Sequence, residues 1–200
     1  MRRAENTSDR RMGPIGSANW LAMLDAAEDI LREEGYAALT SRRVAERIGV
    51  KQRLVYYYFQ TMDELIVETF RRLAVRELDR LRAAAASERP LRALWDAATH
   101  SSDPRIISEF MALAGRLERL KAEVIAFIDD SRAIQVEALS VALGRRPELT
   151  KLSAPALALL ATGVALALNR EAHLGIAAGH RDLSNAALVL LGEFEPAPPP

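Results

Sequence analysis

The chain has 200 residues, half of them apolar, with 27 basic and 27 acidic side chains. This length allows one large domain or two small ones, and a zero net charge excludes polyanion binding by bulk charge. The absence of cysteine excludes disulfides, thiol catalysis and cysteine-based metal sites.

The most apolar stretch of the chain is too short for a membrane span. It covers residues 154–168, 15 in all, whereas a helix needs roughly 20 to cross a bilayer. Pro155 and Gly163 interrupt it, and no apolar signal segment follows Met1. We therefore expect a soluble, cytoplasmic protein without membrane contact.

The N-terminal residues 1–16 have no apolar periodicity and contain four arginines. We expect a disordered basic arm, which could lie in a minor groove or simply be a solvated tail. An apolar stripe at helical spacing then predicts a helix from about Ser17 that ends at Gly35.

Residues 40–59, TSRRVAERIGVKQRLVYYYF, have the spacing of a helix-turn-helix. Val44 and Val55 face inward, Ala45 lies where two helices touch, and Gly49 lies at the sharp turn, which favours glycine. The residues expected to face outward are of types that bind phosphates and base edges; they are Arg42, Arg43, Lys51, Gln52, Arg53, Tyr56 and Tyr57. A plain helical hairpin with a glycine turn is the simpler alternative.

Charge supports the DNA-binding interpretation locally. Residues 36–60 hold five basic side chains and one acid, whereas residues 61–200 hold 17 basic and 19 acidic ones. The positive field is therefore expected at this segment alone.

The rest of the chain predicts helices only. Thr61 and Glu64 form a capping-box pattern at the start of a long helix. Further helices are expected from about residue 91, from Pro104, over 118–143 with a stop at Gly144, over 154–177 and over 182–193. The fold class is all-α, with a three-helix head joined by a long helix to a C-terminal helical domain. We expect a basic arm at 1–16, a DNA-binding domain at 17–63, an effector-binding and dimerisation domain at 64–194, and a Pro-rich tail at 195–200.

From about Leu21 to Phe70 the chain resembles the tetracycline-repressor (TetR/AcrR) family of bacterial regulators. The matching words are Leu24-Asp25-Ala26-Ala27, Glu33-Glu34-Gly35-Tyr36, Thr40-Ser41, Val44-Ala45, Gly49-Val50, Val55-Tyr56, Tyr58-Phe59 and Asp63-Glu64-Leu65. The resemblance implies a homodimeric repressor on a palindromic operator in double-stranded DNA. It also implies that a small molecule in the C-terminal domain releases the DNA.

The family's DNA contacts carry over by position. Base reading falls on Arg42, Lys51, Gln52 and Arg53, and phosphate binding on Thr40, Ser41, Tyr56, Tyr57 and Tyr58. Tyr58 also fills a core position in the spacing. The chain departs from the family in two ways: Met62 replaces the usual lysine, and Arg53-Leu54 replace small residues.

The C-terminal domain offers candidates for a ligand pocket, for which ordinary core packing is the alternative. They are Trp95, His100, Phe110, Met111, Leu113, Arg116, Phe127, Ile134 and Asn169. Arg116 could pair with an anionic ligand or with a nearby glutamate. We expect a mostly apolar small-molecule effector.

The Ala- and Leu-rich last helices suit a four-helix dimer interface, which would place two heads about 34–36 Å apart. No cofactor and no metal are expected. His173 and His180 are seven residues apart with Glu171 nearby, but two imidazoles two helical turns apart cannot share one metal unaided, and no third ligand is evident. We expect no enzyme. A regulator without an effector and an all-α ligand-converting enzyme stay open as alternatives.

Overall fold

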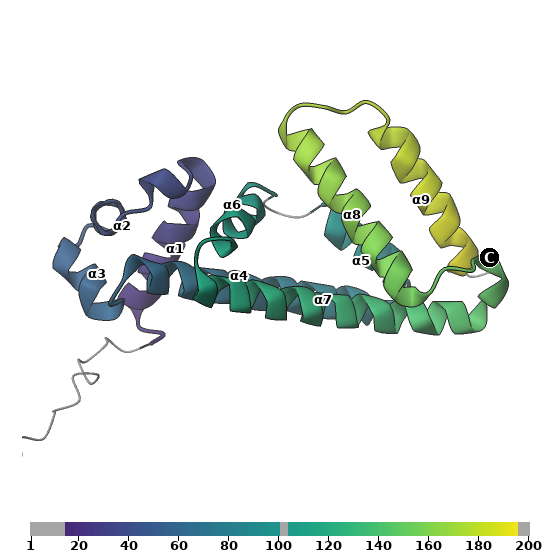
Figure 1. The fold of residues 1–200 in the computed structure, drawn as a ribbon, viewed down its shortest axis with the longest axis horizontal. Coiled ribbons are helices and arrows are strands. Elements are labelled where there is room, and N and C mark those ends of the chain that lie inside the picture. The colour runs from purple at the N-terminus through teal and green to yellow at the C-terminus, as the bar shows by residue number, and fades with distance from the viewer. Residues whose placement is uncertain (1–14, 101–103, 196–200) are drawn as a thin grey trace, which may run out of the picture. The chain divides into compact units, whose positions relative to one another are not determined.

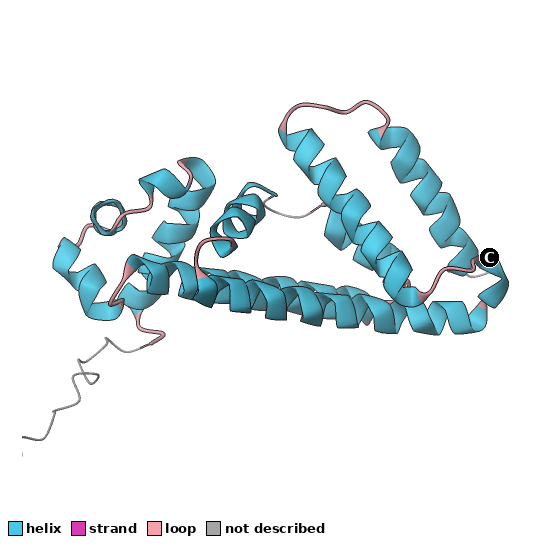
Figure 2. Ribbon diagram, viewed as in Figure 1, coloured by secondary structure: helices cyan, strands magenta, loops and turns pink. Residues whose placement is uncertain are grey.

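The computed structural model describes residues 15–100 and 104–195, and within these ranges the chain is helical without any strand (Figures 1 and 2). The all-α prediction is confirmed. The α-helices are α1 (Ala18–Glu33), α2 (Ser41–Arg47), α3 (Gln52–Tyr58), α4 (Met62–Ala85), α5 (Pro90–Thr99), α6 (Pro104–Ala114), α7 (Glu118–Arg145), α8 (Ala154–His173) and α9 (His180–Phe194). Short 3-10 helices occupy Tyr36–Ala38 and Pro147–Leu149.

The chain divides into two compact units. The first unit reaches Arg72 and also takes in Glu109–Lys121; the second holds Leu73–Ser108 and everything from Ala122 onward. The first unit thus extends beyond the predicted boundary at residue 63 and includes the start of α4. The predicted arm falls almost entirely, and the predicted tail from residue 196, outside the described residues.

The core of the first unit is aromatic and aliphatic. Trp20 stacks on Phe59 with ring centroids 6.2 Å apart, and Phe70 meets Phe110 edge to face at 5.1 Å. At its margin the Arg72 guanidinium reaches Asp25 at 2.7 Å and the buried Glu28 at 3.1 Å. The two Arg72 ion pairs join α1 to the N-terminal half of α4.

The helix ends of the first unit follow the sequence signals, with one difference. Ser17 caps α1, and Gly35 follows it with a φ of 80°. Thr61 Oγ1 accepts the backbone N–H of Glu64 at 3.1 Å, as the capping box predicts. The Glu64 carboxylate, however, accepts from the backbone N–H of Gln60 at 2.8 Å, one residue before the predicted partner Thr61.

In the second unit, the C-terminal end of the described chain caps helix α5. The carboxylate of Glu195 accepts the backbone N–H groups of Leu91 and Arg92 at 2.7 and 3.1 Å, and so caps the start of α5. The Asn169 side chain of α8 donates to the carbonyl of Ala98 near the other end of α5, at 2.8 Å. Residues 71 to 104 positions further along the chain therefore fix both ends of α5.

Two predicted helix ends in this unit were wrong. Helix α7 runs past Gly144 to Arg145, because one glycine costs a helix only about 1 kcal/mol. Helix α8 ends at His173, before Gly175 with its φ of 78°, rather than at residue 177.

The two histidines considered for a metal site lie on different helices. His173 ends α8, whereas His180 begins α9 and its Nε2 lies 2.9 Å from a Glu171 carboxylate oxygen. The described residues contain no group of three or more side chains suited to a metal. Among those residues, too, no helix combines the length and the apolar character that crossing a membrane requires.

Candidate nucleic-acid interface and ligand cavity

Helices α2 and α3 form a tight helical pair with a glycine turn. Thr40 caps α2 by accepting the backbone N–H of Arg43 at 3.1 Å. Gly49 then adopts a φ of 70°, and the N–H of Val50 closes the turn on the carbonyl of Ala45 at 3.0 Å. The left-handed backbone at Gly49 is the conformation that glycine adopts most cheaply.

The inward positions of the motif are buried as the spacing predicts. Val44, Ala45 and Val55 are at most 2% exposed and pack in the core of the first unit. These apolar side chains form the buried part of the contact between α2 and α3, and other residues of both helices face solvent.

Most predicted DNA contacts lie on that solvent face. The exposed residues are Thr40, Arg42, Lys51, Gln52, Arg53, Tyr56 and Tyr57. Tyr56 and Tyr57 are about half exposed, at 51% and 47%, although aromatic side chains of this size are more often buried. Their exposure keeps two phenol hydroxyl groups available to a partner.

Two predicted phosphate-binding residues are buried instead. Tyr58 is 6% exposed and its hydroxyl accepts a hydrogen bond from Ser17 Oγ at 3.3 Å; the core role of this position therefore prevails. Ser41 is 4% exposed. Its hydroxyl accepts from Gln52 Nε2 at 2.8 Å and donates to the Tyr56 hydroxyl at 2.9 Å, so both of its polar contacts are internal.

Three of the five basic residues between positions 36 and 60 form ion pairs. Arg42 Nε lies 2.8 Å from a Glu46 carboxylate oxygen, Arg43 bonds to Glu34, and Arg47 bonds to Glu33 and Glu34. The hydrogen bond from Arg43 lowers the pKa of Glu34. The hydrogen bond to Glu46 raises the pKa of Arg42.

Lys51 and Arg53 have no ion-pair partner among the described residues. The positive charge that no acid neutralises is therefore confined to fewer residues than the count over 36–60 predicts. That window stopped short of Glu33 and Glu34, which precede it in sequence and fold back onto α2. The positive charge concentrates at the start of α3, the end of a helix that itself favours anions.

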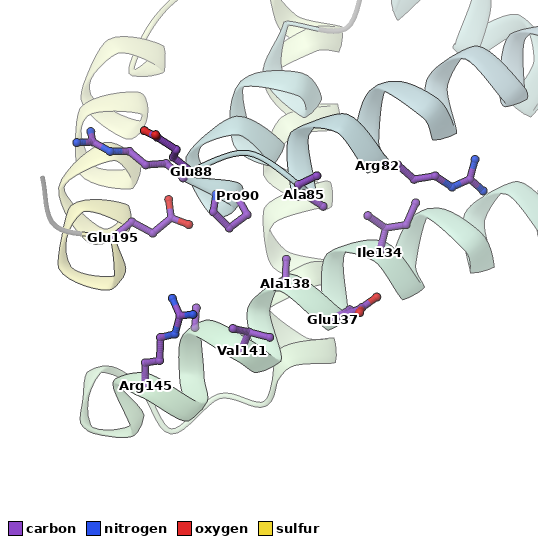
Figure 3. Close-up of a pocket in the computed structure, with 13 residues that line it drawn as sticks. Arg82, Ala85, Glu88, Pro90, Ile134, Glu137, Ala138, Val141, Arg145 and Glu195 are labelled. Atoms are coloured by element: carbon purple, nitrogen blue, oxygen red, sulfur yellow. The ribbon is translucent and has the colours of Figure 1, made fainter. Parts of the chain in front are cut away.

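The second unit contains a cavity of about 760 Å³ (Figure 3). Its apolar wall comes from the end of α4, the start of α5 and the C-terminal half of α7, and the Arg145 side chain points from α7 toward Glu195 (Figure 3). The lining residues are Arg82, Ala85, Ala86, Glu88, Arg89, Pro90, Ile134, Glu137, Ala138, Val141, Ala142, Arg145 and Glu195. Arg82 is already paired with Asp79 at 2.9 Å.

The predicted pocket residues are dispersed rather than gathered. Ile134 lines the large cavity and Trp95 a smaller one of about 70 Å³. Phe110 is fully buried in the core of the first unit, so that for this residue the packing alternative is correct. Met111, Arg116 and His100 are exposed, Leu113 is buried and Phe127 is half-buried, and Asn169 is engaged by α5.

Helices α2 and α3, joined by the turn at Gly49 and with one face of α3 exposed, have the geometry of a helix-turn-helix. Residues 23–69 match the model of the bacterial regulatory proteins of the tetR family. The resemblance drawn from the sequence words is thereby confirmed. No curated protein matches the chain.

Solved structures of similar fold extend over most of the chain. A transcriptional regulator from Rhodococcus sp. Rha1 is 21% identical, with 91% of this chain and 100% of that chain covered and a TM-score of 0.70. A TetR transcription regulator from Haloarcula marismortui is 19% identical, with coverage of 88% and 96% and a TM-score of 0.71. SmeT in complex with triclosan is 20% identical, with coverage of 92% and 100% and a TM-score of 0.62. At these identities the likeness is one of fold.

Proposed function

We propose that this chain is a homodimeric repressor that leaves a palindromic operator when a small, mostly apolar molecule binds its second unit. The observation that carries the proposal is the start of α3. There, Lys51, Gln52 and Arg53 are exposed together on a helix-turn-helix of the tetR family. Arginine and lysine suit guanine, and glutamine suits adenine.

The proposed site combines two kinds of contact. Arg42, Lys51, Gln52 and Arg53 would read base edges in the major groove, whereas Thr40, Tyr56 and Tyr57 would hold phosphates. Arg42 can exchange its partner Glu46 for a base edge, because that pair is largely exposed, at 80% and 50% of the two side chains. Exposed pairs of this kind contribute little to stability.

The proposed dimer forms through α8 and α9. Leu159 and Leu166 on α8, and Leu183 and Leu190 on α9, are all more than 40% exposed. Each pair is seven residues apart, a spacing that places both members on one helix face. A second copy would cover these stripes in a four-helix arrangement, and a two-fold axis there would give two heads for two half-sites.

The proposed effector site is the cavity of about 760 Å³. Its volume falls within the range of about 300–1,000 Å³ that small-molecule sites occupy. Alanine, valine, isoleucine and proline side chains supply its apolar wall. The triclosan complex of SmeT, which has a similar fold, supports a small and largely apolar effector for this chain.

The first experiment is selection of genomic DNA fragments by the purified protein at physiological salt, followed by sequencing of the bound sites. We expect a palindrome with half-sites about one helical turn apart. Binding that is salt-sensitive but indifferent to sequence would contradict base reading. In that case turnover of small molecules by the second unit becomes the function to test.

The dimer is tested separately by sedimentation. We expect Leu159→Glu to yield monomers that bind a half-site weakly. The matched control is Val75→Glu on α4, which replaces a side chain of equal exposure, 57% against 58%, and should leave the dimer intact. A dimer that survives Leu159→Glu combined with Leu190→Glu would contradict the assignment to α8 and α9.

The effector is tested by melting temperature. Apolar compounds of triclosan's size should raise the melting temperature, by an amount that grows with the logarithm of ligand concentration above Kd, and should release the operator. Ile134→Trp, which fills the cavity, should abolish both effects. If compounds bind without releasing DNA, the chain is a regulator that is not gated by a ligand.

A further inference from the structure

A buried hydroxyl group connects two predicted DNA contacts of α3. Ser41, the first residue of α2, is 4% exposed. Its Oγ accepts a hydrogen bond from Gln52 Nε2 at 2.8 Å and donates one to the Tyr56 hydroxyl at 2.9 Å. The three polar groups therefore form one chain of hydrogen bonds, Gln52 to Ser41 to Tyr56.

The supply of hydrogens fixes what each end of this chain can still offer. A serine hydroxyl has one hydrogen, and Ser41 donates it to Tyr56. The hydrogen of the Tyr56 hydroxyl therefore remains for an outside acceptor, and the side chain is 51% exposed. Phosphate oxygens are acceptors only, so a DNA phosphate complements this end of the chain.

The other end offers the two groups that read adenine. The Gln52 amide carries two N–H groups and a carbonyl oxygen, and Ser41 takes one of the N–H groups. One donor and one acceptor remain on an exposed side chain. A glutamine needs both to bind the N7 and N6 positions of adenine in the major groove.

We propose that Ser41 is a positioning residue that couples the phosphate contact of Tyr56 to the base contact of Gln52. Its hydroxyl holds the Gln52 amide in one rotamer before DNA arrives, which reduces the side-chain entropy lost on binding. When a phosphate accepts the hydrogen of the Tyr56 hydroxyl, the hydrogen bonds all donate in the same order, from Gln52 to Ser41, from Ser41 to Tyr56 and from Tyr56 to the phosphate. The inference rests on the proposed function and assigns Ser41 a role other than direct phosphate binding.

A purely structural role for this hydroxyl is separable from the positioning role. Thr40, not Ser41, caps α2 by accepting the backbone N–H of Arg43. Ser41→Ala therefore leaves the helix cap intact and removes only the link between the two side chains. It leaves the Gln52 amide free to adopt other rotamers.

The test measures affinities of purified protein for the selected operator and for operators with each base pair changed, at one fixed salt concentration. We expect Gln52→Ala to lose about tenfold discrimination at one base pair per half-site, within the range for a bidentate contact. Ser41→Ala should lose discrimination at the same base pair. Ser41→Ala combined with Gln52→Ala should lose no more than Gln52→Ala alone, because coupled residues are not additive.

Three further variants complete the test. Ser41→Thr keeps the hydroxyl and should restore discrimination. Arg53→Ala should relax a different base pair, and its effect should add to that of Ser41→Ala. Tyr56→Phe, which leaves the sequence of α2 unchanged, should weaken binding to every sequence and also relax the Gln52 base pair. It keeps the proposal testable if Ser41→Ala does not fold.

The outcomes separate this inference from the proposed function. Selection of no sequence at all would overturn both. An operator on which Gln52→Ala relaxes one base pair, while Ser41→Ala and Tyr56→Phe preserve every preference, would overturn the coupling alone. Uniform weakening by Ser41→Ala, or an effect that adds to that of Gln52→Ala, would overturn it as well.

Discussion

The carboxylate of Glu34 receives three hydrogen bonds from the guanidinium group of Arg43, at 2.8 to 3.1 Å. Glu34 directly follows α1 and Arg43 lies in the first turn of α2, so this fork joins the two helices. Arg47 adds a fourth bond to the same carboxylate at 3.1 Å. The Glu34 carboxylate therefore holds the side of α2 that carries Arg43 and Arg47.

The Glu34 fork predicts an acid-sensitive contribution to stability. The hydrogen bond from Arg43 lowers the pKa of Glu34 below its ordinary value, which is about 4.3. The stabilisation is therefore complete above that value and is lost as pH falls through the lower pKa of the folded state. We expect Glu34→Gln to unfold at lower urea concentration than the unmodified protein at pH 7, and the difference to vanish in strong acid.

The matched control for Glu34 is Glu46→Gln. Glu46 pairs with Arg42 one turn away on the same exposed helix, so its loss breaks no contact between helices. This variant should unfold at nearly the same urea concentration as the unmodified protein. An equal loss in both variants would show that the fork between α1 and α2 has no special weight.

The turn at Gly49 predicts opposite effects of the same substitution at two glycines. Gly49 has a φ of 70°, and a Cβ there would have nothing within 4 Å. Gly49→Ala should therefore cost only the backbone term, about 1–2 kcal/mol of unfolding free energy. Gly144→Ala, in the helical backbone of α7 with the same open surroundings, should instead gain about 0.5–1 kcal/mol. Urea titrations of both variants measure the two signs.

The Phe110 ring predicts a large packing effect in the core of the first unit. It is fully buried and meets Phe70 edge to face at 5.1 Å. We expect Phe110→Ala to lower the free energy of unfolding by about 3–5 kcal/mol. Met111→Ala, at a neighbouring residue that is 38% exposed, should change it little. A Phe110 variant of normal stability with altered effector affinity would restore its role as a ligand contact.

The local parts of this structure were predictable from the sequence, and the long-range parts were not. The contacts of Val44, Gly49 and Val55 lie within a dozen residues, and their spacing alone identifies the motif. The cap of Glu195 on α5 joins segments about a hundred residues apart, and no periodicity records it. The large cavity was not predicted either, because a charged residue at a helix end, such as Arg145, is ordinarily expected to face solvent.

The ion pair between Glu34 and Arg43 is intermediate between a local contact and a long-range one. Glu34 and Arg43 are nine residues apart, too far for a pair within one helix, and they meet only because the chain turns at Gly35. A count over residues 36–60 therefore overestimated the free positive charge. Extending the window by three residues would have included both acids that neutralise Arg43 and Arg47.

The unpaired charge at the start of α3 predicts which cations determine the salt dependence of DNA binding. Lys51 and Arg53 have no ion-pair partner among the described residues, whereas Arg47 is held by Glu33 and Glu34. Each free cation that meets a phosphate contributes about 0.9 to the slope of log affinity against log salt. We expect Lys51→Ala and Arg53→Ala each to reduce the magnitude of this slope by up to about 0.9. The measurement uses duplex DNA without an operator sequence. Arg47→Ala should lower it much less, because its charge is already neutralised in the free protein. Equal slopes for all three variants would mean that the ion pairs of α2 open on DNA, and that the positive surface extends over both helices.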